Sequence, residues 1–503
     1  MIILKRLSPV VLVNKLGRYI GISTGTGDFY DLTSETYALL QRWNKGISLL
    51  RVASPRGKIL ALGKTLGIPS KILKLFPLPK KKITSATEKN SSASLTDLTI
   101  NLTSNCNLRC VYCWNDHGKY SNTRFLKGKT AKSEKRAKVA CMPVEVALKA
   151  VDTLVKLRGN DKDLVVDFYG GEPLLNLATL MATVNYCREN QSKWKVNFHF
   201  LLATNGTLLT PSIAKKLLNK GVQIAVSIDG PKAVHDHNRP FIDGEGSFGA
   251  ISANLKNMPK VIMKRLVGRS TVTPFFPDMV KLYEHLKGLG FERIEIFESE
   301  DACHRIAPRG GSSFFSTKEN YELLCRSYEK LALRYIDDVV SGSLNYSKTF
   351  FNRFFKLMQR LYYNHEVTGG CPAARGQIAV ATAGTIYPCT SFLGIKEFEL
   401  GNVQDGLEDK KYKSFIEKTN KRFEYCQKEC ELFSLCRSTG SCLNVNYYFN
   451  GDPALPHKKS CALFGEKLAL AAATLAILFD KIPHRLEKLF GSDPAGKRGN
   501  KLY

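Results

Sequence analysis

The sequence predicts an α/β protein in which helices cover a parallel sheet. Between Leu98 and about Glu298, apolar runs of strand length alternate with helical patterns, and this alternation is typical of right-handed β–α–β units. The polar motifs directly follow the predicted strands, which is where ligands lie in such folds. An apolar fraction of 44% agrees with a soluble globular protein.

Size and cysteine content indicate a multidomain protein without a disulfide scaffold. A chain of 503 residues has room for two to four domains. Its 14 cysteines are too sparse for a disulfide scaffold and gather at metal-ligand spacings, so we expect a reducing, cytoplasmic location. Lys15 interrupts the apolar run near the start, which argues against a signal peptide. The longest apolar run, Leu468–Phe479, is too short to span a bilayer, and we expect no membrane association.

The net charge of +29 attracts anionic partners. Nucleic acid, an anionic membrane and an acidic peptide are all candidates, and charge alone does not choose among them. The segment His117–Cys141 concentrates this charge, with eight Lys or Arg residues and one Glu. It reads as a solvated loop, although its position would also allow it to guide an acidic substrate.

Residues 1–78 predict a small winged-helix-like domain. Val10–Val13, Tyr19–Ser23 and Gly27–Tyr30 are strand candidates, and a helix is expected over residues 33–44, followed by short helical patterns around 47–53 and 57–66. Such a domain could bind a peptide, bind DNA, or only pack against its neighbours. Residues 79–95 carry three consecutive lysines and no periodicity, which predicts a linker.

Residues 96–300 carry the alternating elements. The expected strands are Leu98–Leu102, Leu164–Phe168, Val196–Leu202, Gln223–Ser227, Val261–Val272 and Arg293–Phe297. The expected helices are Pro143–Arg158, Leu174–Glu189, Pro211–Lys220, Phe248–Asn257 and Met279–Leu289. Residues 301–370 follow as connecting helices, over Lys318–Val340 and Lys348–Tyr363.

Three cysteines lie on the loop that leaves the first expected strand. Cys106, Cys110 and Cys113 have the spacing C-x3-C-x2-C. A loop this short can aim three thiolates at one point, and thiolate is the ligand of iron–sulfur clusters. A 4Fe–4S cube held by three cysteines leaves one iron open to another ligand. A partial zinc site or three buried thiols are the alternatives.

A second motif follows the next strand: Gly170, Gly171 and Glu172, ahead of Pro173. With the three cysteines and the aromatic Tyr112, it resembles the radical S-adenosylmethionine (SAM) superfamily. The resemblance implies a partial (β/α)6 TIM-like barrel, a 4Fe–4S cluster on Cys106, Cys110 and Cys113, and SAM bound at its open iron. It also implies that the Gly-Gly-Glu segment contacts the amino group of SAM and that Tyr112 lies by the adenine. The residues themselves suit this, because glycines allow close backbone approach and Glu172 supplies a carboxylate for an ammonium.

Two further loops follow the third and fourth strands. Asn205 belongs to a Thr-Asn-Gly turn and is expected to bind the cofactor at the same mouth of the barrel. Ser227 begins a Ser-Ile-Asp-Gly-Pro turn that continues to Arg239. The second stretch resembles the peptide- and protein-modifying branch of the superfamily, which implies that Ser227 and Arg239 approach the methionyl carboxylate of SAM. Without the resemblance, Ser-Ile-Asp-Gly-Pro is a favourable turn sequence.

A second group of cysteines lies within residues 371–461. Their pattern resembles the SPASM domain, which implies two auxiliary 4Fe–4S clusters, one on Cys371, Cys389 and Cys442, the other on Cys426, Cys430, Cys436 and Cys461. The spacing departs from the family around Cys426 and before Cys442, and zinc is the rival metal. Residues 462–503 are expected to form a helix and a basic tail. Cys141, Cys187, Cys303 and Cys325 match no pattern and are expected to be ordinary thiols.

These observations lead to an expected function. The front domain resembles leader-peptide recognition domains, so we expect an enzyme that modifies a ribosomally made precursor peptide by hydrogen abstraction and thioether or carbon–carbon crosslinking. The expected partners are that peptide and a low-potential flavodoxin or ferredoxin. Sulfatase maturation is one alternative, although those enzymes carry an aspartate where this chain has Thr390. A cluster-containing nucleic-acid-binding regulator is another, and it predicts salt-sensitive binding without SAM cleavage.

Overall fold

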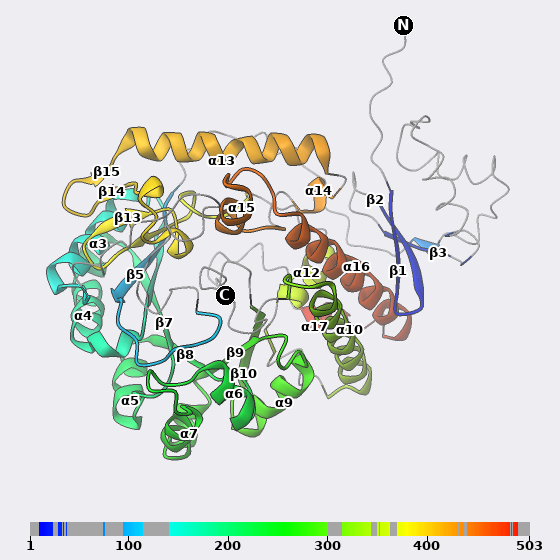
Figure 1. Ribbon diagram of the computed structural model, residues 1–503, viewed down its shortest axis with the longest axis horizontal. Coiled ribbons are helices and arrows are strands. Elements are labelled where there is room, and N and C mark those ends of the chain that lie inside the picture. Colours follow the sequence, from blue (N-terminus) through cyan, green and yellow to red (C-terminus); the bar gives the residue numbers. More distant parts are fainter. Residues whose placement is uncertain are drawn as a thin grey trace, which may run out of the picture.

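The computed structural model describes residues 10–23, 29–32, 34, 37, 74–75, 94–113, 140–299, 314–343, 350–351, 353–362, 370–430, 432–436, 440–482, 484 and 486–490. Most of them form one α/β body built on an eleven-stranded mixed sheet. The sheet curves, and helices α3, α4, α5, α7 and α9 lie on its outer side (Figure 1). The expected α/β fold with a partial barrel is therefore confirmed.

Six consecutive parallel strands form the barrel part of this sheet. They are β5 (Asp97–Thr103), β6 (Asp163–Gly170), β7 (Asn197–Thr204), β8 (Val222–Ser227), β9 (Val267–Val272) and β10 (Arg293–Glu298). Each lies where a strand was expected. Their carboxyl ends meet at one edge, so the motif loops after β5, β6, β7 and β8 are brought together there.

The crossover helices also lie close to their expected positions. They are α3 (Val144–Leu157), α4 (Leu177–Trp194), α5 (Pro211–Asn219), α7 (Phe248–Lys256) and α9 (Met279–Gly288). In α3 the buried residues Val146, Ala147, Ala150 and Leu154 recur every three or four positions, which places one apolar stripe on the sheet. Helix α6 (Lys232–Asn238) was not expected. The 3-10 turn η3 (Pro173–Asn176) precedes α4.

One expected strand was too long. The sequence predicts one strand over Val261–Val272, but residues 260–263 form the short helix α8 (Lys260–Met263), and β9 begins only at Val267. The reason is Pro259, which occupies the N-cap and fixes the backbone for a helical turn. Ile262 and Met263 are both apolar and both buried. The helical turn therefore buries the apolar residues that suggested a strand.

The cysteine-rich part extends the same sheet, which the sequence did not predict. Strand β12 (Gln377–Val380) pairs in parallel with β5, and β13 (Thr385–Tyr387), β14 (Gly401–Asn402) and β15 (Gly406–Leu407) follow as antiparallel strands. At the other edge, β11 (Phe350–Phe351) pairs with β10. The cysteine-rich segment is therefore joined to the strand that leads to Cys106.

Helices and 3-10 turns complete the carboxyl-terminal part. They are α10 (Lys318–Ser341), α12 (Arg353–Tyr362), η5 (Thr390–Phe392), η6 (Lys396–Phe398), α13 (Asp409–Glu429), α14 (Phe433–Cys436), α15 (Leu443–Asn450), α16 (Lys458–Lys481) and α17 (Leu486–Phe490). Helix α16 packs against α10 and α12, and Figure 1 shows the three side by side. Helix α10 agrees with the first connecting helix that was expected. The second was expected too early, over Lys348–Tyr363, because Phe350–Phe351 pairs with β10 as a strand and α12 begins at Arg353.

Helix α16 is longer than its apolar run suggested. Among the helices of the described residues, it alone has the length and mean hydropathy (1.7) to cross a membrane. Of its most apolar window, 61% is buried inside the protein. Leu468, Ala472 and Leu475 are among the fully buried residues of the core. The apolar character of α16 is therefore used for packing within the fold.

A separate four-stranded antiparallel sheet contains β1 (Val10–Lys15), β2 (Arg18–Ser23), β3 (Phe29–Leu32) and β4 (Lys74–Leu75). The first three strands were expected. Leu16 and Gly17 both have positive φ (52° and 72°), as a two-residue type I′ hairpin requires. The helices expected over residues 33–66 lie outside the described residues, apart from isolated positions, so the winged helix stays a prediction.

Candidate radical site at the carboxyl ends of the strands

The loop after β5 is held by backbone hydrogen bonds on two sides. The amides of Arg109 and Val111 donate to the carbonyls of Pro240 and Asn238, at 2.8 and 2.9 Å. The amide of Cys113 donates to the carbonyl of Cys110 at 3.1 Å, which closes a tight turn between the last two cysteines. The loop is thus fixed to the segment that follows α6, and its shape does not depend on the three cysteine side chains alone.

Burial raises the pKa of two thiols of this loop, Cys106 and Cys110. It raises the pKa of Cys106 to about 11 and that of Cys110 to about 12, and each thiol also feels another cysteine of the loop. Arg239 acts against the shift at Cys110. Without a metal these thiols hold their protons at neutral pH, so binding of an iron–sulfur cluster would release them. Three partly buried, mutually close thiols suit such a cluster.

The two glycines of the second motif lie against this loop. A Cβ on Gly170 would come within 2.4 Å of the carbonyl oxygen of Thr103, and one on Gly171 within 2.0 Å of that of Asn105. In turn, the amides of Gly171 and Glu172 donate to these same two oxygens, at 2.7 and 2.9 Å. The glycines are therefore required for close contact with the end of β5 and with the cysteine loop, and their expected contact with SAM stays a prediction.

Glu172 forms hydrogen bonds inside the protein. Its side chain is fully buried, and its carboxylate accepts hydrogen bonds from the amide of Leu174 (3.0 Å), the hydroxyl of Thr204 (2.7 Å) and the amide of Asn205 (2.7 Å). Burial raises its pKa, and these bonds oppose the rise. This carboxylate ties β6 to the end of β7, and the expected contact of the segment with the amino group of SAM stays a prediction.

Asn205 extends this support to the cysteine loop. Its side-chain amide donates to Oδ1 of Asn107 at 2.8 Å and lies 4.0 Å from Sγ of Cys106. Its own Oδ1 accepts from the amide and the hydroxyl of Thr207, at 3.0 and 2.7 Å. Asn205 is thus fixed by the turn after β7 and positions the loop that contains Cys106.

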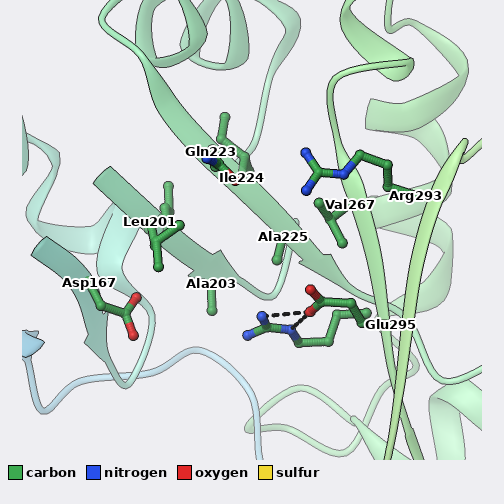
Figure 2. A pocket seen from close by; sticks show the side chains of 11 residues that line it. Asp167, Leu201, Ala203, Gln223, Ile224, Ala225, Val267, Arg293 and Glu295 are labelled. Carbon is green, nitrogen blue, oxygen red and sulfur yellow. Dashed lines mark hydrogen bonds and ion pairs between the residues drawn. The ribbon is translucent and has the colours of Figure 1, made fainter. Parts of the chain in front are cut away.

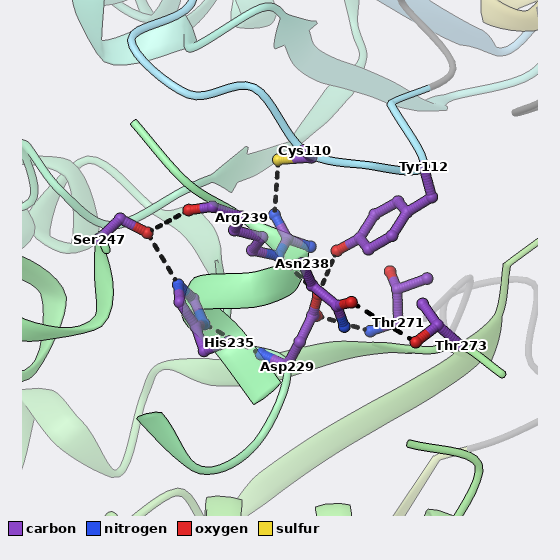
Figure 3. A network of polar contacts seen from close by, with 9 residues as sticks. All are labelled: Cys110, Tyr112, Asp229, His235, Asn238, Arg239, Ser247, Thr271 and Thr273. Atoms are coloured by element: carbon purple, nitrogen blue, oxygen red, sulfur yellow. Dashed lines mark hydrogen bonds and ion pairs between the residues drawn. The ribbon is translucent and has the colours of Figure 1, made fainter. Parts of the chain in front are cut away.

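A buried polar network lies on the opposite side of the loop (Figure 3). Asp229 has no exposed surface, and its carboxylate accepts from the Tyr112 hydroxyl, from Nε of Arg239 at 3.0 Å and from the amide of Thr271 at 2.9 Å. Nη1 of Arg239 lies 4.0 Å from Sγ of Cys110, and its guanidinium stacks over the Tyr112 ring at 5.3 Å. Asp229 therefore links β8 and β9 to the cysteine loop.

The charges in this network are matched. Burial alone would lower the pKa of Arg239, but the carboxylate of Asp229 raises it well above the usual value, so the guanidinium keeps its charge. Burial raises the pKa of Tyr112, so its hydroxyl stays protonated and donates to Asp229. Ser227, the last residue of β8, is buried two positions before Asp229. The expected contacts of Tyr112, Ser227 and Arg239 with SAM stay predictions.

His235 completes the support of Arg239. Its Nδ1 accepts from the Asp229 amide (3.2 Å), so its Nε2 carries the proton and donates to the Ser247 hydroxyl (3.0 Å). That hydroxyl donates to the Arg239 carbonyl at 2.6 Å. Burial lowers the pKa of His235 to about 4, which keeps the ring neutral. The sequence analysis did not identify Asp229 and His235 as site residues. The feature that could have indicated Asp229 is its place in the Ser-Ile-Asp-Gly-Pro turn, in which Gly230 adopts a φ of 101°.

Below the network, the barrel interior is polar. A small cavity of about 50 Å³ is lined by residues from β6 to β10 (Figure 2). Arg269 donates from Nε to Glu295 at 2.9 Å, and Nη2 lies 2.7 Å from the same oxygen. Asp167 and Gln223 also line this space. Arg269 pairs in register with Ser227 on the neighbouring strand, so the interior polar layer adjoins the site directly.

The cysteines of the second group separate into two sets. The Cys389 thiol interacts with Cys371 and Cys442, while that of Cys461 interacts with Cys436, Cys426 and Cys430. These are the two sets that the SPASM resemblance implied. Burial raises the pKa of Cys389 strongly and that of Cys461 to about 12.

The unusual spacing around Cys426 has a structural reason. Cys426 lies in the last turn of α13 and Cys430 is its C-cap, with the Cys430 amide donating to the Cys426 carbonyl at 2.9 Å. Three intervening residues therefore place both on one helical turn. The remaining cysteines that the structure describes are separate from both sets: Cys187 is buried in the core, Cys141 is exposed, and Cys325 lies beside Tyr321 on α10. Cys303 lies outside the described residues.

Comparison with known proteins agrees with this geometry. The model of the Radical SAM superfamily matches residues 100–287. The chain is 27% identical over 369 residues to a cysteine-type anaerobic sulfatase-maturating enzyme of Clostridium perfringens (strain 13 / Type A), covering 69% of this chain and 90% of that protein. It is 21% identical over 375 residues to the radical SAM cyclopropyl synthase TigE of Paramaledivibacter caminithermalis, covering 71% and 70%.

A solved structure shares the fold. Native anSMEcpe with bound AdoMet and the Cp18Cys peptide superimposes with a TM-score of 0.60 at 22% identity, covering 77% of this chain and 100% of that one. The family match spans β5 to α9, which is the part that holds the cysteine loop, the two glycines and Asp229. The chain is therefore a radical SAM enzyme, distantly related to the anaerobic sulfatase-maturating enzymes.

Proposed function

We propose that this radical SAM enzyme modifies a ribosomally made precursor peptide, by hydrogen abstraction followed by thioether or carbon–carbon crosslinking. The observation that carries the proposal is the pair of additional cysteine sets, one of which borders a cavity of about 610 Å³. A cavity of this size accommodates small ligands or peptide side chains. A related solved structure contains a bound peptide, which supports the same substrate class.

In this proposal, Cys106, Cys110 and Cys113 hold the radical cluster. When bound, that cluster and SAM supply a 5′-deoxyadenosyl radical. The protein keeps the cysteine loop in place through Glu172 and Asn205 on one side and through Asp229 on the other. The Arg239 guanidinium places a positive charge beside the thiolate of Cys110 and so offsets part of the negative charge of a thiolate-bound cluster.

We assign Cys371, Cys389 and Cys442 to one auxiliary 4Fe–4S cluster and Cys426, Cys430, Cys436 and Cys461 to a second. The match of residues 100–287 to the Radical SAM superfamily and the similarity to sulfatase-maturating enzymes favour clusters over zinc.

Sulfatase maturation is the second candidate, because the C. perfringens relative is a sulfatase-maturating enzyme. In such enzymes, by the resemblance described above, an aspartate that follows the auxiliary cysteine is the proposed base. Here Thr390 follows Cys389 and lines the cavity. A hydroxyl has no basicity at neutral pH that would replace a carboxylate, which favours a different reaction. The net charge of +29 would also suit a nucleic-acid-binding regulator, but the match of residues 100–287 to the Radical SAM superfamily favours an enzyme.

The antiparallel sheet β1–β4 is proposed to recognise a leader segment of the precursor. Strand addition to an exposed sheet edge is a common mode of peptide binding. The proposed electron donor is a flavodoxin or ferredoxin, whose acidic surface a net charge of +29 would attract. Deleting residues 1–78 should weaken binding of the precursor peptide, measured by fluorescence anisotropy, and spare uncoupled SAM cleavage. Unchanged affinity for the peptide would contradict leader recognition.

The decisive experiment is anaerobic reconstitution with iron and sulfide, followed by reduction in the presence of SAM. We expect about three clusters by iron analysis, and 5′-deoxyadenosine by chromatography. Short reading frames beside the gene supply candidate peptides, and mass spectrometry then distinguishes a crosslink from formylglycine on a sulfatase-derived peptide. Conversion of the sulfatase peptide alone would favour the second candidate. Modification of neither peptide class would contradict both.

A further inference from the structure

The cavity beside Cys371, Cys389 and Cys442 is lined by more than cysteines. Helix α12 contributes Lys356, Leu357 and Arg360, and helix α16 contributes Leu463, Phe464 and Lys467. The hydroxyls of Thr390 and Ser391 line it as well. The lining therefore combines apolar walls, hydroxyl groups and three basic side chains, which is the composition of a binding site that orients a ligand through a few polar groups.

One of these basic side chains is already neutralised. Nζ of Lys467 donates to Oε1 of Glu298 at 2.8 Å, and the Tyr328 hydroxyl donates to Oε2 of the same carboxylate at 2.8 Å. The side chains of Lys467 and Glu298 are only 11% and 7% exposed, so this pair is closed off and satisfied within the protein. It does not supply charge to a ligand.

Arg360 is different. It is partly buried and lines the cavity from α12, and its guanidinium interacts with the thiol of Cys436 in the second cysteine set. The guanidinium is still charged at neutral pH. Within the part of the chain that the structure describes, no carboxylate forms an ion pair with it. A guanidinium that lines a cavity and forms no ion pair with a described carboxylate can bind a carboxylate that enters the cavity.

We propose that this cavity binds a carboxylate of the substrate peptide, an Asp or Glu side chain close to the modified residue, with Arg360 as its anchor. The proposal rests on the peptide-modifying function proposed above and specifies its substrate class. A guanidinium can bind a carboxylate through two parallel hydrogen bonds, and Thr390 also lines the cavity. The acidic residue would be held beside the first auxiliary cysteine set.

The test uses the reconstituted full-length protein and a displayed library of cysteine-containing peptides with random flanking residues. The wild type should enrich peptides with Asp or Glu near the cysteine. Arg360→Gln should lose this preference and bind a selected acidic peptide about tenfold more weakly or worse. Arg360→Lys should keep part of it, because the charge remains and the two-bond geometry is lost. Lys413→Gln on α13, whose side chain is 70% exposed, removes one positive charge elsewhere and should behave as the wild type.

Two results would overturn the proposal. One is the absence of an acidic preference in the wild type, or its persistence in Arg360→Gln. The other is a lower reduction potential of the auxiliary clusters in Arg360→Gln with unchanged peptide selection, since Arg360 would then serve the clusters and not the substrate. Iron content and circular dichroism identify a variant that fails to fold. If Arg360→Gln fails in this way, the peptide preference of Arg360→Lys decides whether Arg360 binds the acidic residue. Failure of the proposed function is distinguishable, because it would appear as missing auxiliary clusters or missing peptide modification in the wild type.

Discussion

Replacing Asp229 by Asn is the most direct test of the network that supports the radical site. The substitution keeps the side-chain shape but removes the charge that faces Arg239. Asp229 is fully buried and the Arg239 side chain is 9% exposed, so solvent screens their interaction very little. Removing one partner of a buried ion pair generally costs about 3–5 kcal/mol, because the other charge is left without compensation. The Asn oxygen can still accept one hydrogen bond, so we expect the lower end, about 3 kcal/mol.

The assay is guanidinium unfolding of the wild type, Asp229→Asn and a control. Asp163→Asn is the control, since Asp163 begins β6 and its side chain is 46% exposed in its contact with His199; its expected loss is below about 0.5 kcal/mol. Tyr112→Phe removes the hydroxyl that donates to Asp229, and the double variant should be non-additive because the two side chains share one network.

A second measurement follows from the position of the network. Because Asp229 fixes Tyr112 and Arg239 against the cysteine loop, Asp229→Asn should also lose iron from the radical cluster while the auxiliary clusters keep theirs. If Asp229→Asn is no less stable than Asp163→Asn and retains its full iron content, the network does not support the loop and the reasoning is wrong.

Three further predictions concern the same site. Alanine at Cys106, Cys110 and Cys113 together should remove one 4Fe–4S cluster and all 5′-deoxyadenosine formation but leave the auxiliary clusters, because their ligands come from residues 371–461; deoxyadenosine at the wild-type rate would refute the assignment. Gly171→Ala places a Cβ within 2.0 Å of a backbone oxygen of the cysteine loop, so it should reduce iron content and SAM cleavage. Gly249→Ala is the control, because nothing lies within 4 Å of its added Cβ, and it should leave both unchanged. Burial lowers the pKa of His235 from 6.5 to about 4, so between these pH values the unfolded state binds a proton that the folded state does not. The free energy of unfolding should therefore fall by about 3 kcal/mol as the pH drops from above 6.5 to 4. A His235→Gln variant should lack this part of the pH dependence in denaturant unfolding, and an unchanged profile would argue against a neutral buried ring.

Much of the fold and of the radical site followed from sequence because the determinants are local. Apolar runs such as Leu98–Leu102 form strands wherever helices can cover them, and parallel order brings the carboxyl ends of β5 to β8 to one edge. The cysteine loop and the glycine pair each follow a strand directly. The later cysteines also lie near one another in the two groups that the family pattern implies, while their ligation of two clusters stays a prediction.

Tertiary structure decided what these residues contact. The sequence contains two glycines and a glutamate but cannot say that they meet the cysteine loop, since Gly171 and Asn105 are brought together only by the pairing of β5 with β6. In the sequence Asp229 is part of a turn motif, whereas in the folded protein its carboxylate accepts hydrogen bonds from Tyr112 and Arg239. The parallel pairing of β12 with β5 joins segments about 280 residues apart. Contacts over such separations depend on how whole elements pack, and short-range patterns in the sequence do not encode them.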